Sequence, residues 1–268
     1  MAFAPKIISA LRRHWHHYLV EAAGPAAFLA VSSVAAVVFL HPSSAVARAL
    51  GPGAMMQRAG VGLVVGGLVV GMAYSPWGQR SGAHFNPAVT LGFWQLGHIR
   101  TADALWYVLA QFAGALAAGL AMKRLLAPWF GYPTIHYNTT RPAPGAYGWL
   151  WALGAEMIIS GGLMLGLLWV LHSARRKHWA GALVGVLLAL YIVVEAPVSG
   201  MSLNPARTLG AAVAAGEGTG LWLYFVGPLA AMWGTAAAYG RYRARRPPAE
   251  RPPQYPDATA SEPPRARP

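Results

Sequence analysis

The chain has no cysteine among its 268 residues, and only 11% of its residues are charged. The absence of cysteine excludes disulfides and thiolate chemistry. Soluble domains carry about 25% charged residues, so the shortage of charge nearly excludes a soluble enzyme. Acidic residues number 8 against 21 Lys and Arg, which gives a net charge of +13. A soluble nucleic-acid binder would need a polar, water-facing surface that this composition does not supply, so we expect no nucleic-acid partner.

Hydrophobic residues make up 56% of the chain and form six continuous runs rich in Ala, Leu, Val and Gly. Each run can cross about 30 Å of hydrocarbon as a helix of roughly 20 residues. The runs lack the alternating polarity of outer-membrane barrel strands. The first run also exceeds the apolar core of a secretory signal, about 7–15 residues, so we expect an uncleaved span. The sequence predicts an all-α membrane protein with six transmembrane helices near 19–40, 58–76, 102–123, 149–171, 179–197 and 219–240.

Basic residues mark one side of this topology. Twelve Lys and Arg lie in the N-terminal segment, in the connections after the second and fourth runs, and at the start of the C-terminal tail, against five on the other side. Positive residues favour the cytoplasmic side, so we expect residues 1–18 and 243–268 to be cytoplasmic and the protein to lie in the cell membrane, where lipids are its neighbours. Eight prolines between Pro247 and Pro268 predict a disordered tail.

Two polar segments between the runs nearly repeat each other. Residues 81–92 (SGAHFNPAVTLG) align without gaps to residues 199–210 (SGMSLNPARTLG), and eight of the twelve positions are identical. One copy follows the second run and the other follows the fifth, so each half has three runs and one copy. Because three is odd, the halves, about 19–123 and 149–242, enter the membrane from opposite sides. The sequence therefore predicts an inverted repeat.

Each copy contains the signals that start a helix. Asn is a favoured N-cap, and Pro suits the first helical turn because it lacks an N–H. The residues concerned are Asn86, Pro87 and Ala88 in one copy and Asn204, Pro205 and Ala206 in the other. About ten further residues rise roughly 15 Å, half the hydrocarbon thickness. A single Asn-Pro can also mark a loop turn, but two copies in equivalent places favour two re-entrant half-helices that meet at their N-termini.

With this pair of Asn-Pro-Ala motifs, the sequence resembles the aquaporin, or major intrinsic protein, family over roughly residues 19–242. The likeness includes Glu21 and Glu156, near the starts of the first and fourth spans, and Gln111 in the third. We expect both glutamates to be structural and to accept N–H bonds from the re-entrant loops. The resemblance implies a six-helix channel with two half-helices, without enzymatic activity or cofactor, assembled as a homotetramer.

The resemblance also implies a narrow outer filter of four residues, which a gap-free count places at Gly66, Ile192, Met201 and Arg207. Water-selective relatives usually carry Phe and His at the first two positions, and glycerol facilitators carry Trp and Gly. This chain carries neither pair of residues, so we expect a more apolar filter that passes water and small uncharged solutes. A facilitator mainly for glycerol, urea or neutral metalloid acids is the alternative, and an ion- or proton-coupled transporter is a more distant one.

Charge exclusion is expected from Arg207 and from the two motif asparagines, whose amides would hold the oxygen of a passing water and stop proton relay. The family pattern also predicts that His84, Gly200 and Ser202 line the pore. Glu195 could line the outer vestibule, pair with Arg207, or be a solvated interfacial carboxylate. The histidines at 14, 16 and 17 fit the spacing of no closed metal site, so we expect no metal.

Overall fold

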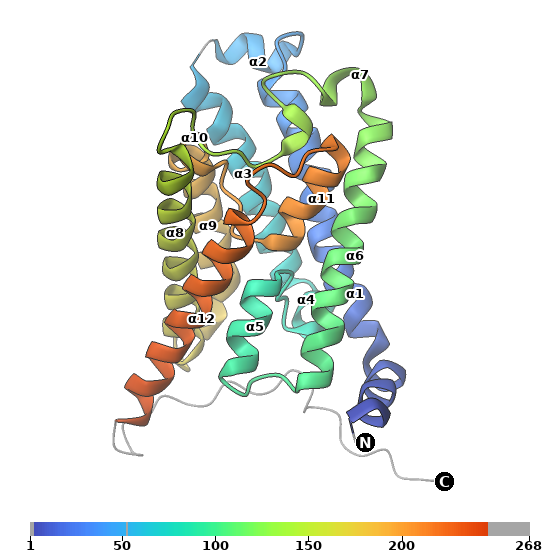
Figure 1. Cartoon of the computed structure of the whole chain (residues 1–268), viewed down its shortest axis with the longest axis vertical. Coiled ribbons are helices and arrows are strands. Elements are labelled where there is room, and N and C mark those ends of the chain that lie inside the picture. The colour runs from blue at the N-terminus through green and yellow to red at the C-terminus, as the bar shows by residue number, and fades with distance from the viewer. Residues whose placement is uncertain (1–2, 52, 246–268) are drawn as a thin grey trace.

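Within residues 3–51 and 53–245, which the computed structural model describes, all regular structure is helical. A chain in hydrocarbon must satisfy its backbone N–H and C=O groups internally, and continuous apolar helices do so. Six long helices stand roughly side by side (Figure 1): α1 Phe3–Leu40, α3 Ala54–Tyr74, α6 Thr101–Leu125, α8 Gly148–Leu171, α9 Ala180–Val194 and α12 Leu223–Ala244.

Shorter helices occupy the connections and the two repeat segments. The half-helices are α5, Pro87–Gln95, and α11, Pro205–Ala215, and they approach each other from opposite ends of the bundle (Figure 1). The others are α2 Ala45–Leu50, α4 Pro76–Ser81, α7 Ala127–Phe130, α10 Ala196–Ser199 and the 3-10 turns η1 His136–Asn138 and η2 Lys177–Trp179. Thus α4 and α5 of the first half correspond to α10 and α11 of the second.

The observed helices correct several predicted boundaries. Helix α1 begins at Phe3, so the segment expected to precede the first span is itself helical, with a kink at His14. Among the described residues, five helical segments are long and apolar enough to span a membrane. The sixth, α12, has 22 residues and rises about 33 Å, but it is less apolar and begins at Leu223 rather than 219. The predicted disordered tail lies outside the described residues from position 246 onward.

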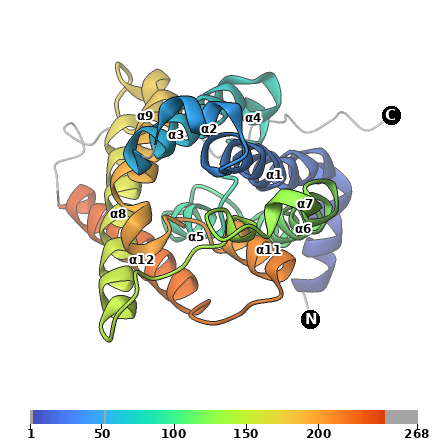
Figure 2. The ribbon, with the colours of Figure 1, turned by 90° about the horizontal axis from the view of Figure 1, so that it is seen from above.

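The two halves interlock. Helices α1 and α6 pack together, as do α8 and α12, and α3 packs against α9. Each half-helix packs on the last long helix of the other half, α5 on α12 and α11 on α6. Seen from above, the long helices enclose α5 and the re-entrant loops (Figure 2). This arrangement holds the two Asn-Pro-Ala segments together inside the bundle.

Small residues permit these close helix contacts, as is usual between helices in lipid. A Cβ atom on Gly114 of α6 would lie 2.0 Å from Ala22 O of α1, and one on Gly119 would lie 2.2 Å from Gly210 O of α11. The long helices can therefore approach closely without a hydrophobic driving force between them.

Candidate functional site

The two re-entrant loops share an unusual backbone. At equivalent positions they turn through the left-handed region, with φ values of 86° and 87°, 51° and 53°, and 51° and 58°. These positions are Gly82 and Gly200, Ala83 and Met201, and Phe85 and Leu203. Non-glycine residues enter this region at a cost and persist only where surrounding contacts hold them. The loops therefore need strong anchors, which the two membrane glutamates supply.

Glu21, fully buried in α1, anchors the first loop. One oxygen, Oε1, accepts hydrogen bonds from Ser81 Oγ at 2.8 Å and His84 N at 3.0 Å. The other, Oε2, accepts from Phe85 N at 2.7 Å and Gln111 Nε2 at 2.7 Å. Four donors around one carboxylate satisfy loop N–H groups that would otherwise be unpaired in the membrane interior.

Glu156 of α8 repeats this arrangement for the second loop. Its Oε1 accepts from Ser199 Oγ and Ser202 N, each at 2.7 Å, and its Oε2 accepts from Leu203 N at 2.9 Å. The backbone N–H partners are equivalent in the two halves. Both glutamates thus stand behind the loops, as hydrogen-bond acceptors for backbone and hydroxyl donors.

Two buried tyrosines add a second anchor to each loop. Tyr107 Oη donates to Ser81 O at 2.7 Å, and Tyr224 Oη donates to Ser199 O at 2.6 Å. Sequence reasoning did not find this pair. The signal was only that each tyrosine lies near the start of the third helix of its half, in α6 and α12.

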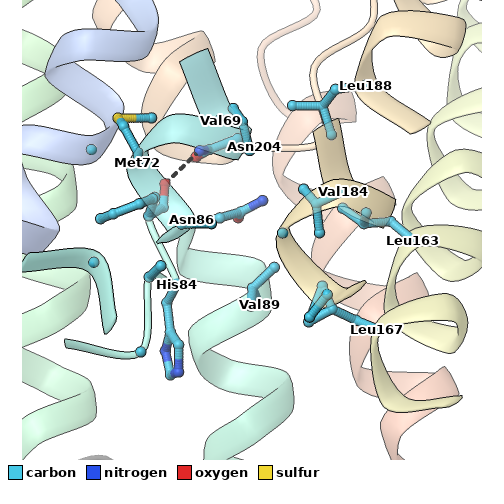
Figure 3. A pocket seen from close by; sticks show the side chains of 18 of the residues that line it. Val69, Met72, His84, Asn86, Val89, Leu163, Leu167, Val184, Leu188 and Asn204 are labelled. Carbon is cyan, nitrogen blue, oxygen red and sulfur yellow. Dashed lines mark hydrogen bonds between the residues drawn. The ribbon is translucent and has the colours of Figure 1, made fainter. Parts of the chain in front are cut away.

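The motif asparagines cap the half-helices and bind each other's loops. Asn86 Oδ1 accepts from Ala88 N at 2.9 Å, while its Nδ2 donates across to Leu203 O at 2.8 Å. Asn204 Oδ1 accepts from Ala206 N at 3.0 Å, and its Nδ2 donates to Phe85 O at 2.8 Å, the bond drawn in Figure 3. Each amide nitrogen carries two N–H groups, so one donor of each remains after the crossed bond is made.

A cavity of 510 Å³ leads to this asparagine pair. Its wall is largely apolar and includes Val69 of α3, and Figure 3 shows Val184 and Leu188 on the helix opposite Asn86 and Asn204. The remaining labelled lining residues are Met72, His84, Val89, Leu163 and Leu167. A solute in this cavity thus meets hydrocarbon on most sides and polar groups from the loops on one.

His84 and Ser202, equivalent in the repeat, both line this cavity. His84 Nδ1 lies 3.2 Å from Thr90 Oγ1, and Ser202 Oγ lies 2.5 Å from Thr208 Oγ1. Thr90 and Thr208 occupy the tenth position of both repeat copies. The sequence alone assigned no role to these two threonines. The available signal was that both repeat copies carry the same residue at this position.

Arg207 is buried in the first turn of α11, with 6% of its surface exposed. Its Nη2 donates to Asn138 Oδ1 at 3.4 Å, while Nε and Nη1 have no hydrogen-bond partner among the described residues. Asn138 belongs to η1 and in turn donates to Ser32 Oγ of α1 at 2.8 Å. The connection between α7 and α8 thus reaches down to the arginine, which the sequence did not indicate.

The same connection explains Gly200, which was predicted to line the pore. A Cβ on Gly200 would lie 2.7 Å from Arg141 N and 2.8 Å from Thr140 Cα. Gly200 is therefore needed for close packing of this connection on the loop, and the cavity lining does not include it. Farther out, an exposed hydrogen bond from Arg141 lowers the pKa of Glu217, which lies between α11 and α12.

Gly66, predicted to belong to the filter, lies against α9. A Cβ there would lie 2.5 Å from Gly185 O and 3.1 Å from Ala189 Cβ, so this face of α3 contacts α9. The inward stripe of α3 passes instead through Val65, which is fully buried between Val61 and the cavity-lining Val69. The gap-free count that gave Gly66 crosses Ser75, where α3 ends and α4 begins.

The other predicted filter residues, Ile192 and Met201, are buried in the same hydrophobic cluster as Val65. Glu195, one turn beyond Ile192, is 7% exposed, and neither of its carboxylate oxygens has a hydrogen-bond partner in the described chain. The interpretation of Glu195 as a solvated interfacial carboxylate is therefore wrong. Its position at the end of α9, against α10, removes it from water.

The chain as a whole has relatives among known proteins. A family model described as "Major intrinsic protein" matches residues 3–239. The chain belongs to the major intrinsic protein family. Membership explains the all-helical fold and identifies an integral, multi-pass membrane protein.

Several family members are similar in sequence. Aquaporin NIP2-3 of Zea mays is 37% identical over 188 residues, covering 69% of this chain and 60% of the relative. Aquaporin NIP1-1 of Zea mays is 37% identical over 185 residues, covering 69% of this chain and 63% of the relative. The chain thus matches less than two thirds of the length of these major intrinsic proteins.

The fold is also found in a solved structure. The X-ray structure of the aquaglyceroporin from Plasmodium falciparum superposes with a TM-score of 0.67 at 21% identity, covering 87% of this chain and 96% of that one. At 21% identity the match shows that the two proteins share a fold. The arrangement of helices and half-helices is that of the major intrinsic protein family.

Proposed function

We propose that this protein is a passive channel that conducts water and small uncharged solutes and excludes protons and ions. The observation that carries the proposal is the crossed pair of asparagine bonds at the end of an apolar cavity.

The asparagine pair provides the means to orient water. After its bond to the opposite loop, each amide of Asn86 and Asn204 keeps one N–H for a water oxygen. The N-termini of α5 and α11 each carry about half a positive charge and add to this field. A water held through its oxygen turns its hydrogens toward the two exits and cannot relay a proton between them.

Arg207 provides the barrier to cations. A unit charge about 4 Å from the guanidinium costs a cation about 4 kcal/mol at an effective dielectric constant near 20. Since 1.4 kcal/mol corresponds to tenfold, this slows cation passage by roughly a thousandfold. A neutral solute meets no such repulsion.

We assign the outer filter to Val65, Ile192, Met201 and Arg207. None of the four carries an aromatic ring, and three are apolar. This composition favours a second candidate function, facilitation of glycerol, urea or neutral metalloid acids, through the same pore. We further propose a cell-membrane location with residues 1–18 and 243–268 in the cytoplasm, and a homotetramer with one pore per subunit.

The test is osmotic shrinkage of proteoliposomes measured by stopped-flow light scattering. Wild-type protein is expected to accelerate shrinkage with an activation energy close to that of free diffusion. Ile192→Trp should block flux by filling the buried constriction. Val194→Trp is the matched control, because it puts the same ring two residues away on a side chain that is 71% exposed.

Folded protein is confirmed for each variant before reconstitution. No acceleration by the wild type, or equal flux through Ile192→Trp, would refute the channel. A voltage-dependent current carried by the wild type would favour an ion-coupled transporter instead. Parallel gradients of glycerol, urea and boric acid decide between water and larger neutral solutes.

A further inference from the structure

The imidazole of His84, in the lining of the cavity, has its chemistry set by residues behind the wall. Its Nδ1 lies 3.2 Å from Thr90 Oγ1, and a hydrogen bond at this distance can run in either direction. Thr90 is fully buried in α5, where its hydroxyl also contacts Asn86 and Gln111. The hydrogens of these neighbours decide in which direction the bond to His84 runs.

The Thr90 hydroxyl has one hydrogen and two lone pairs. Its hydrogen goes to Asn86 O at 3.0 Å, a carbonyl one turn back in the chain, which can only accept. One lone pair accepts from Gln111 Nε2 at 3.0 Å. That amide nitrogen also donates to Glu21 Oε2 at 2.7 Å, which fixes the orientation of the amide. The lone pair that remains faces His84, so Nδ1 must carry a hydrogen and donate it.

The other ring nitrogen, Nε2, is left to the cavity. His84 is buried and no carboxylate of the described chain bonds to its ring, so the imidazole is neutral and carries a single hydrogen. With that hydrogen on Nδ1, Nε2 has a lone pair. Nε2 has no protein partner among the described residues, and His84 lines the cavity together with Asn86 (Figure 3). The rings of Phe93 and Tyr107, with centroids 4.9 and 5.3 Å from that of His84, hold the imidazole in this orientation.

We propose that Thr90 is a positioning residue that fixes this tautomer, and that Nε2 of His84 accepts hydrogen bonds from solutes in the pore. The inference deepens the proposed function and rests on it. The asparagine pair offers donors to a solute, whereas His84 offers an acceptor. The cavity therefore favours small neutral solutes that carry both an acceptor oxygen and N–H or O–H groups, such as urea and polyols. A solute with acceptors alone leaves a desolvated acceptor unpaired at His84.

The experiment records solid-state nitrogen NMR spectra of histidine-labelled protein in proteoliposomes, which distinguish a ring nitrogen that carries a hydrogen from one with a lone pair. The chain has 9 histidines, and the His84 signals are those lost in His84→Gln. The wild type is expected to carry the His84 hydrogen on Nδ1. In Thr90→Val this population should fall by at least about fivefold, because the buried Nδ1–H loses its acceptor.

Two further variants control for the loss of the hydroxyl. Thr90→Ser keeps the hydroxyl and should restore the wild-type tautomer. Thr208→Val makes the same change at the equivalent position of the second repeat copy, and it should leave the His84 signals unchanged. Urea flux in the same proteoliposomes measures recognition of the solute. It should fall by about fivefold in Thr90→Val and recover in Thr90→Ser.

A His84 hydrogen on Nε2 in the wild type would overturn the proposal, and this outcome requires no variant to fold. Wild-type His84 signals in Thr90→Val, with a size-exclusion profile that shows folded protein, would overturn it equally. A changed tautomer with wild-type urea flux would refute recognition of the solute by Nε2. Absence of any flux through the wild type would instead refute the proposed channel, while the NMR spectrum still decides the tautomer.

Discussion

The orientation of α3 can be tested by adding a single methyl group at Gly66. In Gly66→Ala the new Cβ would lie 2.5 Å from Gly185 O, where ordinary contacts are 3.4–4 Å. Helices α3 and α9 must then separate by almost an ångström along much of their contact. Overpacking of this kind costs about 1–3 kcal/mol.

Gly67→Ala on the same helix is the matched control, because a Cβ there meets nothing within 4 Å. Both substitutions gain the same helix propensity, about 1 kcal/mol, so that gain cancels between them. The difference should therefore be the packing cost alone. At about 2–4 °C per kcal/mol, Gly66→Ala should melt roughly 2–12 °C below Gly67→Ala.

The assay is thermal unfolding of both variants in the same detergent, followed by solute flux in proteoliposomes. If Gly66→Ala melts together with Gly67→Ala and lowers glycerol or urea flux, Gly66 faces the pore. That result would refute the orientation of α3 in which Val65 faces the pore and Gly66 faces α9, and it would restore Gly66 to the filter. A lower melting temperature with no selective change in solute flux supports Val65 in its place.

Two further predictions concern the loops. Arg207→Val should raise cation or proton leakage by up to roughly a thousandfold, since it removes a barrier of about 4 kcal/mol, and unchanged exclusion in a liposome flux assay would contradict this. Glu156→Gln should lower the melting temperature, because an amide nitrogen then faces a buried backbone N–H, at about 1–3 kcal/mol for the unpaired group. Glu217→Gln, at an exposed carboxylate, is its control and should melt close to the wild type.

Much of the fold could be predicted from local features of the sequence. Apolar runs specify helices in lipid because only internal hydrogen bonding is available there, and Asn-Pro favours the start of a helix through capping that needs no distant partner. The repeat then implies the opposed half-helices without any knowledge of packing. Both copies also carry threonine at the tenth repeat position, Thr90 and Thr208. This identity indicates the residues that contact His84 and Ser202 in the cavity lining.

The remaining features depend on how helices rotate against each other, which local signals do not specify. Gly66 and Val65 are adjacent in sequence and differ by about 100° around α3, so one break in register exchanges their faces. The contact between Asn138 and Arg207 joins a connection to a half-helix 69 residues away. Such contacts follow from the path of the whole chain and have no signature in the residues themselves.

The crossed asparagine bonds have a consequence for synthesis of the protein. Asn86 and its acceptor Leu203 are 117 residues apart, and Asn204 and its acceptor Phe85 are 119 apart. At about 5–20 residues per second, a ribosome needs roughly 6–24 seconds to deliver the second partner after the first. During that interval the first loop is held by Glu21 but its asparagine amide has no native acceptor. The pore is therefore completed only when the last third of the chain has entered the membrane, and a protein truncated before α11 would leave an unfinished loop for quality control to recognise.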